Sequence, residues 1–133
     1  MTKILILGAN SAIAQAVARH YCSKETEFCL IGRNPEKLET LKRDLKDRGA
    51  GSIFTHTADL TDTAHHQALI TNCYQELQRF DIILIAHGYL GEQRLAENDF
   101  QEALRIFSVN FLSACSLLGV LAPLLEKQGQ GTV

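Results

Sequence analysis

The sequence lacks the features that would place its 133 residues outside the class of ordinary globular proteins. Neither sign of charge dominates, because 13 basic and 15 acidic residues give a net charge of -2, spread without charged tails. This balance gives no indication of a nucleic-acid partner or of an anionic membrane surface. No apolar stretch reaches the roughly 20 residues that span a bilayer, so no membrane partner is expected. The longest, residues 111–125, contains two serines and Pro123 and is predicted to be a buried helix.

Signals for export and for cysteine-based sites are also missing. The N-terminus, MTKILILGAN, has one lysine, a short apolar run and no cleavage site, so a cytoplasmic location is expected by default. The four cysteines include no C-x-x-C pair, so neither a redox dithiol nor a zinc knuckle is indicated, and reduced core thiols are predicted. His65 and His66 have no partners at metal-ligand spacing, and a solvated helix face is predicted for them. No metal site is expected.

The sequence does contain a regular alternation of strand and helix patterns. Short β-branched or leucine-rich runs predict strands at residues 3–7, 27–31, 52–58 and 81–86. Helices are predicted to begin at the capping residues Ser11, Asn34 and Thr61 or Asp62. A long fourth helix follows residue 100, and Thr132-Val133 resembles the start of a fifth strand. This alternation predicts one α/β domain over residues 1–133, with a parallel sheet between two layers of helices.

Apolar residues at helical spacing predict the buried face of each helix. These faces are Ile13, Ala16, Val17 and Tyr21 in the first helix; Leu38, Leu41 and Leu45 in the second; Leu69, Cys73, Leu77 and Phe80 in the third; and Phe100, Leu104, Phe107, Phe111, Cys115 and Leu118 in the fourth.

The stretch ILILGANSAIAQAVA, residues 4–18, joins the first strand to the first helix through a glycine. Such a turn aims unpaired backbone N–H groups and the positive end of the helix dipole at one point, where a phosphate can bind. Gly8 provides the turn, but Ala12 and Ala14 stand where nucleotide-binding turns usually carry glycine. Both can remain helical, so we expect the phosphates to move slightly outward. On these residues alone, a nucleotide site and a plain strand-to-helix turn are almost equally supported.

The end of the second strand favours a nucleotide site and indicates which nucleotide binds. Folds that bind NAD place Asp or Glu here, about 20 residues beyond the glycines, to bond the ribose 2′-hydroxyl. The segment reads CLIGRN, so Gly32 and Arg33 replace the carboxylate. Gly32 leaves room for a 2′-phosphate, and Arg33 can pair with it. The sequence therefore predicts NADP(H) in preference to NAD(H), with a solvated surface arginine as the alternative.

These features resemble the short-chain dehydrogenase/reductase family along the whole chain. The family's Thr-Gly-x-x-x-Gly-x-Gly turn matches LGANSAIA at residues 7–14, with departures at Leu7, Ala12 and Ala14. Its Asp-Leu after the third strand matches residues 59–60, and its Asn-Asn-Ala-Gly is replaced by IAHG at residues 85–88. SAIA and AHGYLG are more similar to one branch, the decaprenylphosphoryl-ribose 2-keto reductases.

The resemblance implies a Rossmann-type, doubly wound sheet in strand order 3-2-1-4 with the start of a fifth strand. It also implies hydride transfer between NADP(H) and a carbonyl or alcohol carbon of a small-molecule substrate. The cofactor-binding residues that it assigns are Gly8, Asn10, Ser11, Ala12, Ile13, Arg33, Asn34, Asp59, Leu60, Ala86, His87 and Gly88.

Three of the assigned residues have alternative interpretations. The resemblance implies that Asp59 contacts the adenine of the cofactor, whereas its alternative role is to cap the third helix. His87 contacts the nicotinamide ribose, or it is a hydrogen-bonded loop histidine. Asn110 matches the family's helical asparagine, whose catalytic role is to support a water that conducts protons, and its alternative role is packing.

The proton-transfer residues of the family are not found. Its Tyr-x-x-x-Lys motif is absent, because Glu25, Gln78 and Gln93 lie four residues after the three tyrosines. We therefore expect the truncated N-terminal part of an oxidoreductase, inactive alone. We also expect a homo-oligomer, because an exposed sheet edge and a long unpartnered helix invite pairing. The alternative is a non-catalytic dinucleotide-binding or sensing module that is complete as it stands.

Overall fold

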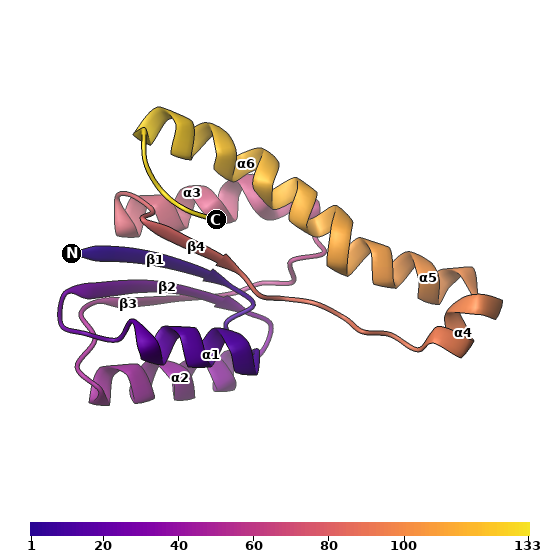
Figure 1. Cartoon of the computed structure of the whole chain (residues 1–133), viewed down its shortest axis with the longest axis horizontal. Coiled ribbons are helices and arrows are strands. Elements are labelled where there is room, and N and C mark those ends of the chain that lie inside the picture. Colours follow the sequence, from indigo (N-terminus) through magenta and orange to yellow (C-terminus); the bar gives the residue numbers. More distant parts are fainter.

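A four-stranded parallel sheet lies between two layers of helices in the computed structural model, which describes all residues 1–133 (Figure 1). The strands are β1 (Thr2–Leu7), β2 (Thr26–Gly32), β3 (Ile53–Thr57) and β4 (Ile82–Ile85). Their order is β3-β2-β1-β4, which confirms the predicted Rossmann-type order. A parallel bridge joins Ile82 to Thr132, so the last residues lie beside β4 where a fifth strand was expected to start.

Helices cover both faces of this sheet. One layer contains α1 (Ala12–His20) and α2 (Pro35–Asp47), and the other contains α3 (His66–Leu77) and α6 (Ser113–Gln128) (Figure 1). A 3₁₀ turn (Thr63–His65) precedes α3. After β4 come α4 (Gln93–Asn98), α5 (Phe100–Phe107) and a π-helical segment (Ser108–Leu112) that leads directly into α6.

Two of the three predicted helix caps are confirmed. Ser11 Oγ accepts a hydrogen bond from Ala14 N at 3.1 Å, and Asn34 Oδ1 accepts one from Lys37 N at 3.1 Å. The start of the third helix was predicted wrongly, because the 3₁₀ turn comes first and no side chain caps α3. Side chains that satisfy the first N–H groups of a helix fix where the chain turns away from a strand.

The centre of the core is β1, whose residues Ile4, Leu5, Ile6 and Leu7 are fully buried. Ile4 and Ile6 belong to the apolar cluster under α1 and α2, and Leu5 and Leu7 to the cluster under α3 and α6. Burying one such side chain contributes about 1.5–3 kcal/mol. The turn that follows β1 is therefore anchored to a fully buried part of the core.

The buried face of α1 differs from the prediction. Ala14 and Ala18 are buried in the core, whereas Ile13 is 72% exposed and Ala16 is exposed. Small residues face the sheet because they let the helix approach β1 closely. Ala14 thus lies at the helix–sheet contact that the family fills with glycine, and its methyl group is part of the packed core.

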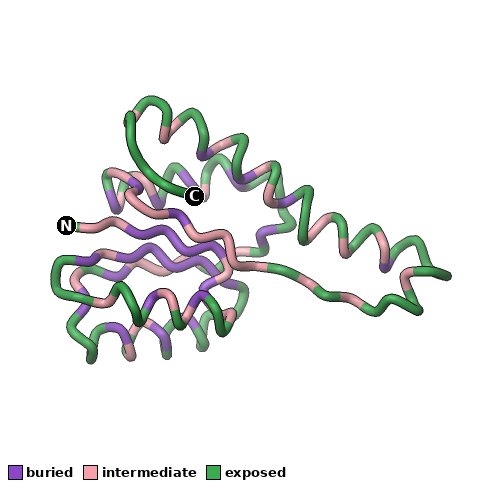
Figure 2. The backbone as a smooth tube through the Cα atoms, in the orientation of Figure 1, coloured by how far each residue is buried: buried purple, intermediate pink, exposed green.

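The helix from Phe100 to Gln128 differs most from the prediction. The residues predicted to be buried are all exposed, and we call them the outer stripe: Phe100, Leu104, Phe107, Phe111, Cys115 and Leu118. Its buried positions are instead Glu102, Ser113, Leu117 and Leu121 (Figure 2). The prediction of a buried helix is wrong because this helix is apolar on more than one face.

This helix also corrects the expectation that no segment could span a bilayer. By length and composition, the 29-residue helix is apolar enough to cross a membrane, and only 17% of its most apolar window is buried. A single helix of this kind is also found as a packing helix of water-soluble proteins. The absence of a membrane partner therefore remains a prediction.

Three side chains elsewhere also differ from expectation. Cys22 is half-buried, so among the predicted core thiols only Cys29 and Cys73 are buried. His66 is 1% exposed rather than solvated, because its Nε2 lies 2.8 Å from Leu60 O and its Nδ1 lies 2.8 Å from Ser116 Oγ. Phe80 lies beyond the end of α3 rather than on it, although it is buried as expected.

Candidate nucleotide site

A pocket of about 1150 Å³ lies where the four strands end at their carboxyl edge. Ligands of open parallel sheets bind at this edge. Ten of the predicted cofactor-binding residues line the pocket: Gly8, Asn10, Ser11, Arg33, Asn34, Asp59, Leu60, Ala86, His87 and Gly88. The strand ends therefore bring together residues from four separate segments of the chain.

Ala12 and Ile13 do not line the pocket with their side chains. Both side chains are exposed on the first turn of α1. Their backbone N–H groups, however, donate to no protein atom, whereas Ala14 N donates to Ser11 Oγ. The first N–H groups of a helix are available to an anion, so these two residues can act through their backbone.

The glycine turn after β1 packs directly on the end of β4. Gly8 has φ +88°, and a Cβ atom there would lie 2.4 Å from His87 N. Gly8 N and Ala9 N both donate to Ile31 O, at 2.9 and 2.8 Å. The turn is therefore fixed between β2 and β4, and only glycine fits at its centre.

The wall of the pocket at the end of β2 carries a free cation. Arg33 is exposed, and its guanidinium makes no hydrogen bond or ion pair. The Asn10 side chain lies across Gly32, where a Cβ atom would be 2.7 Å from Asn10 Nδ2. Asn10 Nδ2 donates to Asn34 O at 3.4 Å, while the buried Asn10 Oδ1 has no partner. A guanidinium and an unsatisfied amide oxygen thus belong to the same wall.

Asp59 lies at the end of β3 and forms a local turn. Its Oδ1 accepts hydrogen bonds from Thr61 N at 3.0 Å and from Thr61 Oγ1 at 2.7 Å. These bonds, the backbone one first, and to a smaller extent the charge of Arg33, lower the pKa of Asp59. The carboxylate is therefore charged at neutral pH, and it does not cap α3, which was the alternative role.

His87 lies at the end of β4 in a defined tautomer. Ser113 Oγ donates to Val109 O at 2.7 Å, so it accepts from His87 Nε2–H at 2.6 Å, as assigned from this network. The hydrogen-bonded loop histidine considered in the sequence is thus observed. His87 Nδ1 is then a buried acceptor without a partner. Burial, and secondly the nearby His66, lower the pKa of His87.

Asn110 acts on the loop after β4 rather than on the pocket itself. Its Nδ2 donates to Tyr89 O at 2.6 Å, and its Oδ1 accepts from Tyr89 N at 2.8 Å. One side chain in the π-helical segment therefore satisfies both backbone groups of a pocket-lining residue. Gly88 lies close to the same oxygen, because a Cβ atom added to Gly88 would be 3.2 Å from Asn110 Oδ1. The geometry corresponds to a positioning role, and the proposed water remains a prediction.

The sequence and this fold match one known family. A family model described as short chain dehydrogenase matches residues 2–133. The chain belongs to the short-chain dehydrogenase family. It is 29% identical over 130 residues to an uncharacterized oxidoreductase of Mycobacterium tuberculosis, covering 98% of this chain and 52% of that protein. It is also 29% identical over 131 residues to benzil reductase ((S)-benzoin forming) of Saccharomyces cerevisiae, and this match covers 93% of this chain and 49% of that protein.

Solved structures of other proteins share the fold of this chain. Levodione reductase has a TM-score of 0.92 at 24% identity, over 99% of this chain and 52% of that one. NAD+-bound xylitol dehydrogenase has a TM-score of 0.88 at 19% identity, and the match covers 98% of this chain and 50% of that one. A polyketide ketoreductase variant with NADPH has a TM-score of 0.87 at 20% identity, and the match also covers 98% of this chain and 50% of that one. The chain spans about half the length of the curated relatives it matches. Relatives of this fold bind either cofactor, so the fold alone does not select one.

Several residues that line the pocket were not predicted from the sequence. Glu36 and Lys37 lie in the first turn of α2, three and four residues after Arg33, so their proximity to the predicted arginine could have indicated them. Tyr89 and Arg105 enter through tertiary packing, with the guanidinium 4.1 Å above the ring. The Tyr89 hydroxyl donates to Glu102 Oε1 at 2.8 Å, and this hydrogen bond is the main cause that raises the pKa of Tyr89. Tyr89 is thus held protonated.

The lowered pKa of His87 predicts a loss of stability in mild acid. The unfolded chain, with the ordinary value of 6.5, takes up the proton before the folded chain does, so stability should fall as pH drops below 6.5. One such group changes the free energy of unfolding by at most about 1.4 kcal/mol per pH unit. Urea denaturation at neutral and mildly acidic pH should show a smaller loss in His87→Gln than in the wild type or in the exposed-site control His20→Gln. Equal losses in all three would contradict this assignment.

Proposed function

We propose that this short-chain dehydrogenase binds NADP(H) at the carboxyl edge of its sheet. We further propose that it is the cofactor-binding part of an oxidoreductase that acts on a carbonyl or alcohol carbon of a small molecule. The observation that carries the cofactor preference is Arg33, a guanidinium without a protein partner at the end of β2. No carboxylate stands at that strand end to bond a free ribose 2′-hydroxyl.

The residues present fit a dinucleotide. Asn10 Oδ1 and His87 Nδ1 are the buried side-chain atoms without a partner, and both belong to residues that line the pocket. Buried polar atoms are rarely left unsatisfied, so two of them at one pocket favour a polar ligand. The free N–H groups of Ala12 and Ile13 suit its phosphates.

Each part of the pocket has a role in this proposal. Arg33 pairs with the 2′-phosphate, Asp59 accepts from the adenine amino group, and His87 Nδ1 accepts from a ribose hydroxyl. The bound cofactor supplies or takes up a hydride. Asn110 positions the loop that carries Tyr89 beside it. No residue of this chain is assigned the proton transfer, because its three tyrosines lack a lysine four residues later.

Replacing Arg33 by alanine should weaken NADPH binding about 10- to 100-fold, equivalent to about 1.4–2.8 kcal/mol, because a charge-assisted bidentate contact is lost. NADH binding should change by less than about threefold, since NADH has no 2′-phosphate. Isothermal titration calorimetry with both nucleotides measures the two affinities.

The matched control for this experiment is Arg43→Ala. Arg43 is also an exposed arginine near this part of the chain, but it pairs with Glu39 in α2 and does not line the pocket. It should leave both affinities unchanged. Equal wild-type affinities for NADPH and NADH would contradict the proposed preference, as would an Arg33→Ala variant that binds NADPH normally. A non-catalytic sensing module would bind the nucleotide at the same site. It would differ from an oxidoreductase in lacking turnover and not in its nucleotide affinity.

A further inference from the structure

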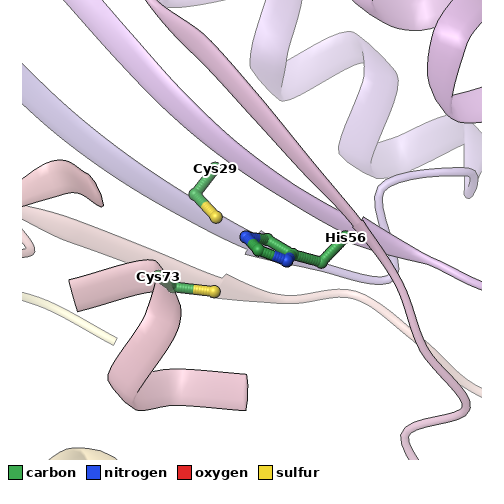
Figure 3. Close-up of side chains that lie close together, drawn as sticks. All are labelled: Cys29, His56 and Cys73. Carbon is green, nitrogen blue, oxygen red and sulfur yellow. The ribbon is translucent and has the colours of Figure 1, made fainter. Parts of the chain in front are cut away.

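Four side chains with metal-binding groups meet on the sheet face opposite α1 and α2. They are Cys29 of β2, His56 of β3, and Cys73 and Glu76 of α3. The ligand atoms of Cys29, His56 and Cys73 lie within 4.8 Å of one another, and both sulfur atoms point toward the imidazole ring (Figure 3). Glu76 Oε2 lies 2.8 Å from His56 Nε2 and 3.7 Å from Cys29 Sγ.

The fold explains why residues so distant in sequence come together. In the parallel pairing of β2 with β3, Cys29 is opposite Phe54 and Ile31 is opposite His56. Side chains two residues apart point to the same face of a sheet, so Cys29 and His56 both project toward α3. Cys73 and Glu76 are three residues apart on α3 and therefore share the helix face above them.

We propose that Cys29, Cys73 and His56, together with Glu76, bind one Zn²⁺ ion. Thiolate and imidazole ligands select zinc over magnesium or calcium, and four protein ligands are typical of a closed, structural zinc site. In a tetrahedral site, Zn–S and Zn–N bonds of about 2.3 and 2.0 Å place neighbouring ligand atoms about 3.4–3.8 Å apart. To complete the site, the separations among the ligand atoms of Cys29, His56 and Cys73 would contract by at most about 1 Å. The 2.8 Å separation between Glu76 Oε2 and His56 Nε2 would widen by about 0.5 Å, and side-chain rotation can supply both changes.

The burial of the four residues gives the site a closed inner side and an open outer side. Cys29 and Cys73 are fully buried, whereas the side chains of His56 and Glu76 are 25% and 31% exposed. An ion can thus enter past His56 and Glu76 and reach the two sulfur atoms behind them. The site is separate from the nucleotide pocket, because none of the four residues lines it.

The experiment uses the full chain after metal removal with a chelator, under reducing conditions. Titration with Zn²⁺ against a chromophoric chelator should give one bound ion per chain, and Co²⁺ should give thiolate charge-transfer and tetrahedral visible bands. Cys29→Ser and Cys73→Ser should each weaken Zn²⁺ binding at least about 100-fold, and His56→Gln about 10- to 100-fold, since loss of a ligand exceeds loss of its supporting contacts. The control Cys22→Ser/Cys115→Ser removes the other two cysteines and should bind Zn²⁺ like the wild type.

His56→Gln keeps the experiment decisive if the core cysteine variants do not fold, because His56 lies partly at the surface. The proposal is overturned if the wild type binds no Zn²⁺, or if the His56→Gln variant and every folded cysteine variant bind it normally.

Discussion

Replacing Gly8 by alanine is expected to destabilise the protein by at least about 3 kcal/mol. The backbone there has φ +88°, which residues with a Cβ atom rarely adopt, and the new atom would lie 2.4 Å from His87 N and 2.7 Å from His87 Cα. The two nearest atoms are backbone, and the third, His87 Cβ, is attached directly to that backbone, so no side-chain rotation relieves the contact. The turn could accept alanine only if β1 and β4 separated, although the last four residues of β1 are fully buried.

The control for this prediction is another glycine of the same chain. Gly119 lies within α6 with nothing near its missing Cβ position, so Gly119→Ala should be neutral or stabilising by up to about 1 kcal/mol. Urea denaturation followed by circular dichroism measures both changes. If Gly8→Ala were within about 1 kcal/mol of the wild type, the close approach of the turn to β4 would be wrong.

Introducing charged residues into the outer stripe is expected to dissociate the predicted homo-oligomer into monomers. Phe107 is 63% exposed and Phe111 is 60% exposed, one turn apart on the same side of the long helix. A continuous apolar surface of this kind typically marks an interface, and a second copy of the chain is the expected partner. Phe107→Glu/Phe111→Glu should raise the dissociation constant at least about 100-fold, equivalent to about 2.8 kcal/mol, because two carboxylates would be buried without partners.

Sedimentation velocity over a concentration series measures this change. The double variant Gln67→Glu/Thr71→Glu adds the same charge on the exposed face of α3 and should associate like the wild type. A wild-type chain that stayed monomeric at all concentrations would contradict the predicted homo-oligomer. Association that survived both double variants would exclude the outer stripe as the interface.

Local signals in the sequence were sufficient for the sheet and for much of the pocket. All four strands lie within one residue of their predicted ends, because buried β-branched and leucine runs have few other interpretations. Ser11 and Asn34 cap helices as predicted, since a cap depends on neighbours within four residues. Gly8 and Arg33 line one pocket because parallel strands end at a common edge, which follows once the strands are known.

Which face of a helix is buried could not be predicted where several faces are apolar. In α1 the alanines face the sheet and Ile13 faces solvent, because a close helix–sheet contact requires small side chains. In the long helix from Phe100 to Gln128 the sequence pattern favours the larger aromatic residues, but the face containing Ser113 and Leu117 packs on the chain itself. Hydrophobicity alone does not identify which of several apolar faces packs on the chain itself.

The cluster around His56 shows a second limit of sequence patterns. Metal motifs are recognised by short spacings within one segment, whereas Cys29, His56 and Cys73 come from three elements and meet only through strand register and helix packing. His66 shows the same limit, because its burial depends on Ser116 in a helix 50 residues away. Neither arrangement leaves a signal in the neighbouring residues.

The π-helical segment lies between the nucleotide pocket and the outer stripe. Asn110 holds both backbone groups of Tyr89, Ser113 bonds His87, and Phe111 of the outer stripe lies between them in sequence. A displacement of the β4 loop by a ligand would therefore act on the segment that carries Phe111, on the surface where a second copy would dock. Thermodynamic reciprocity then requires that, if the cofactor tightens dimerisation by some factor, the dimer binds the cofactor more tightly by that same factor. Cofactor affinity would accordingly depend on protein concentration.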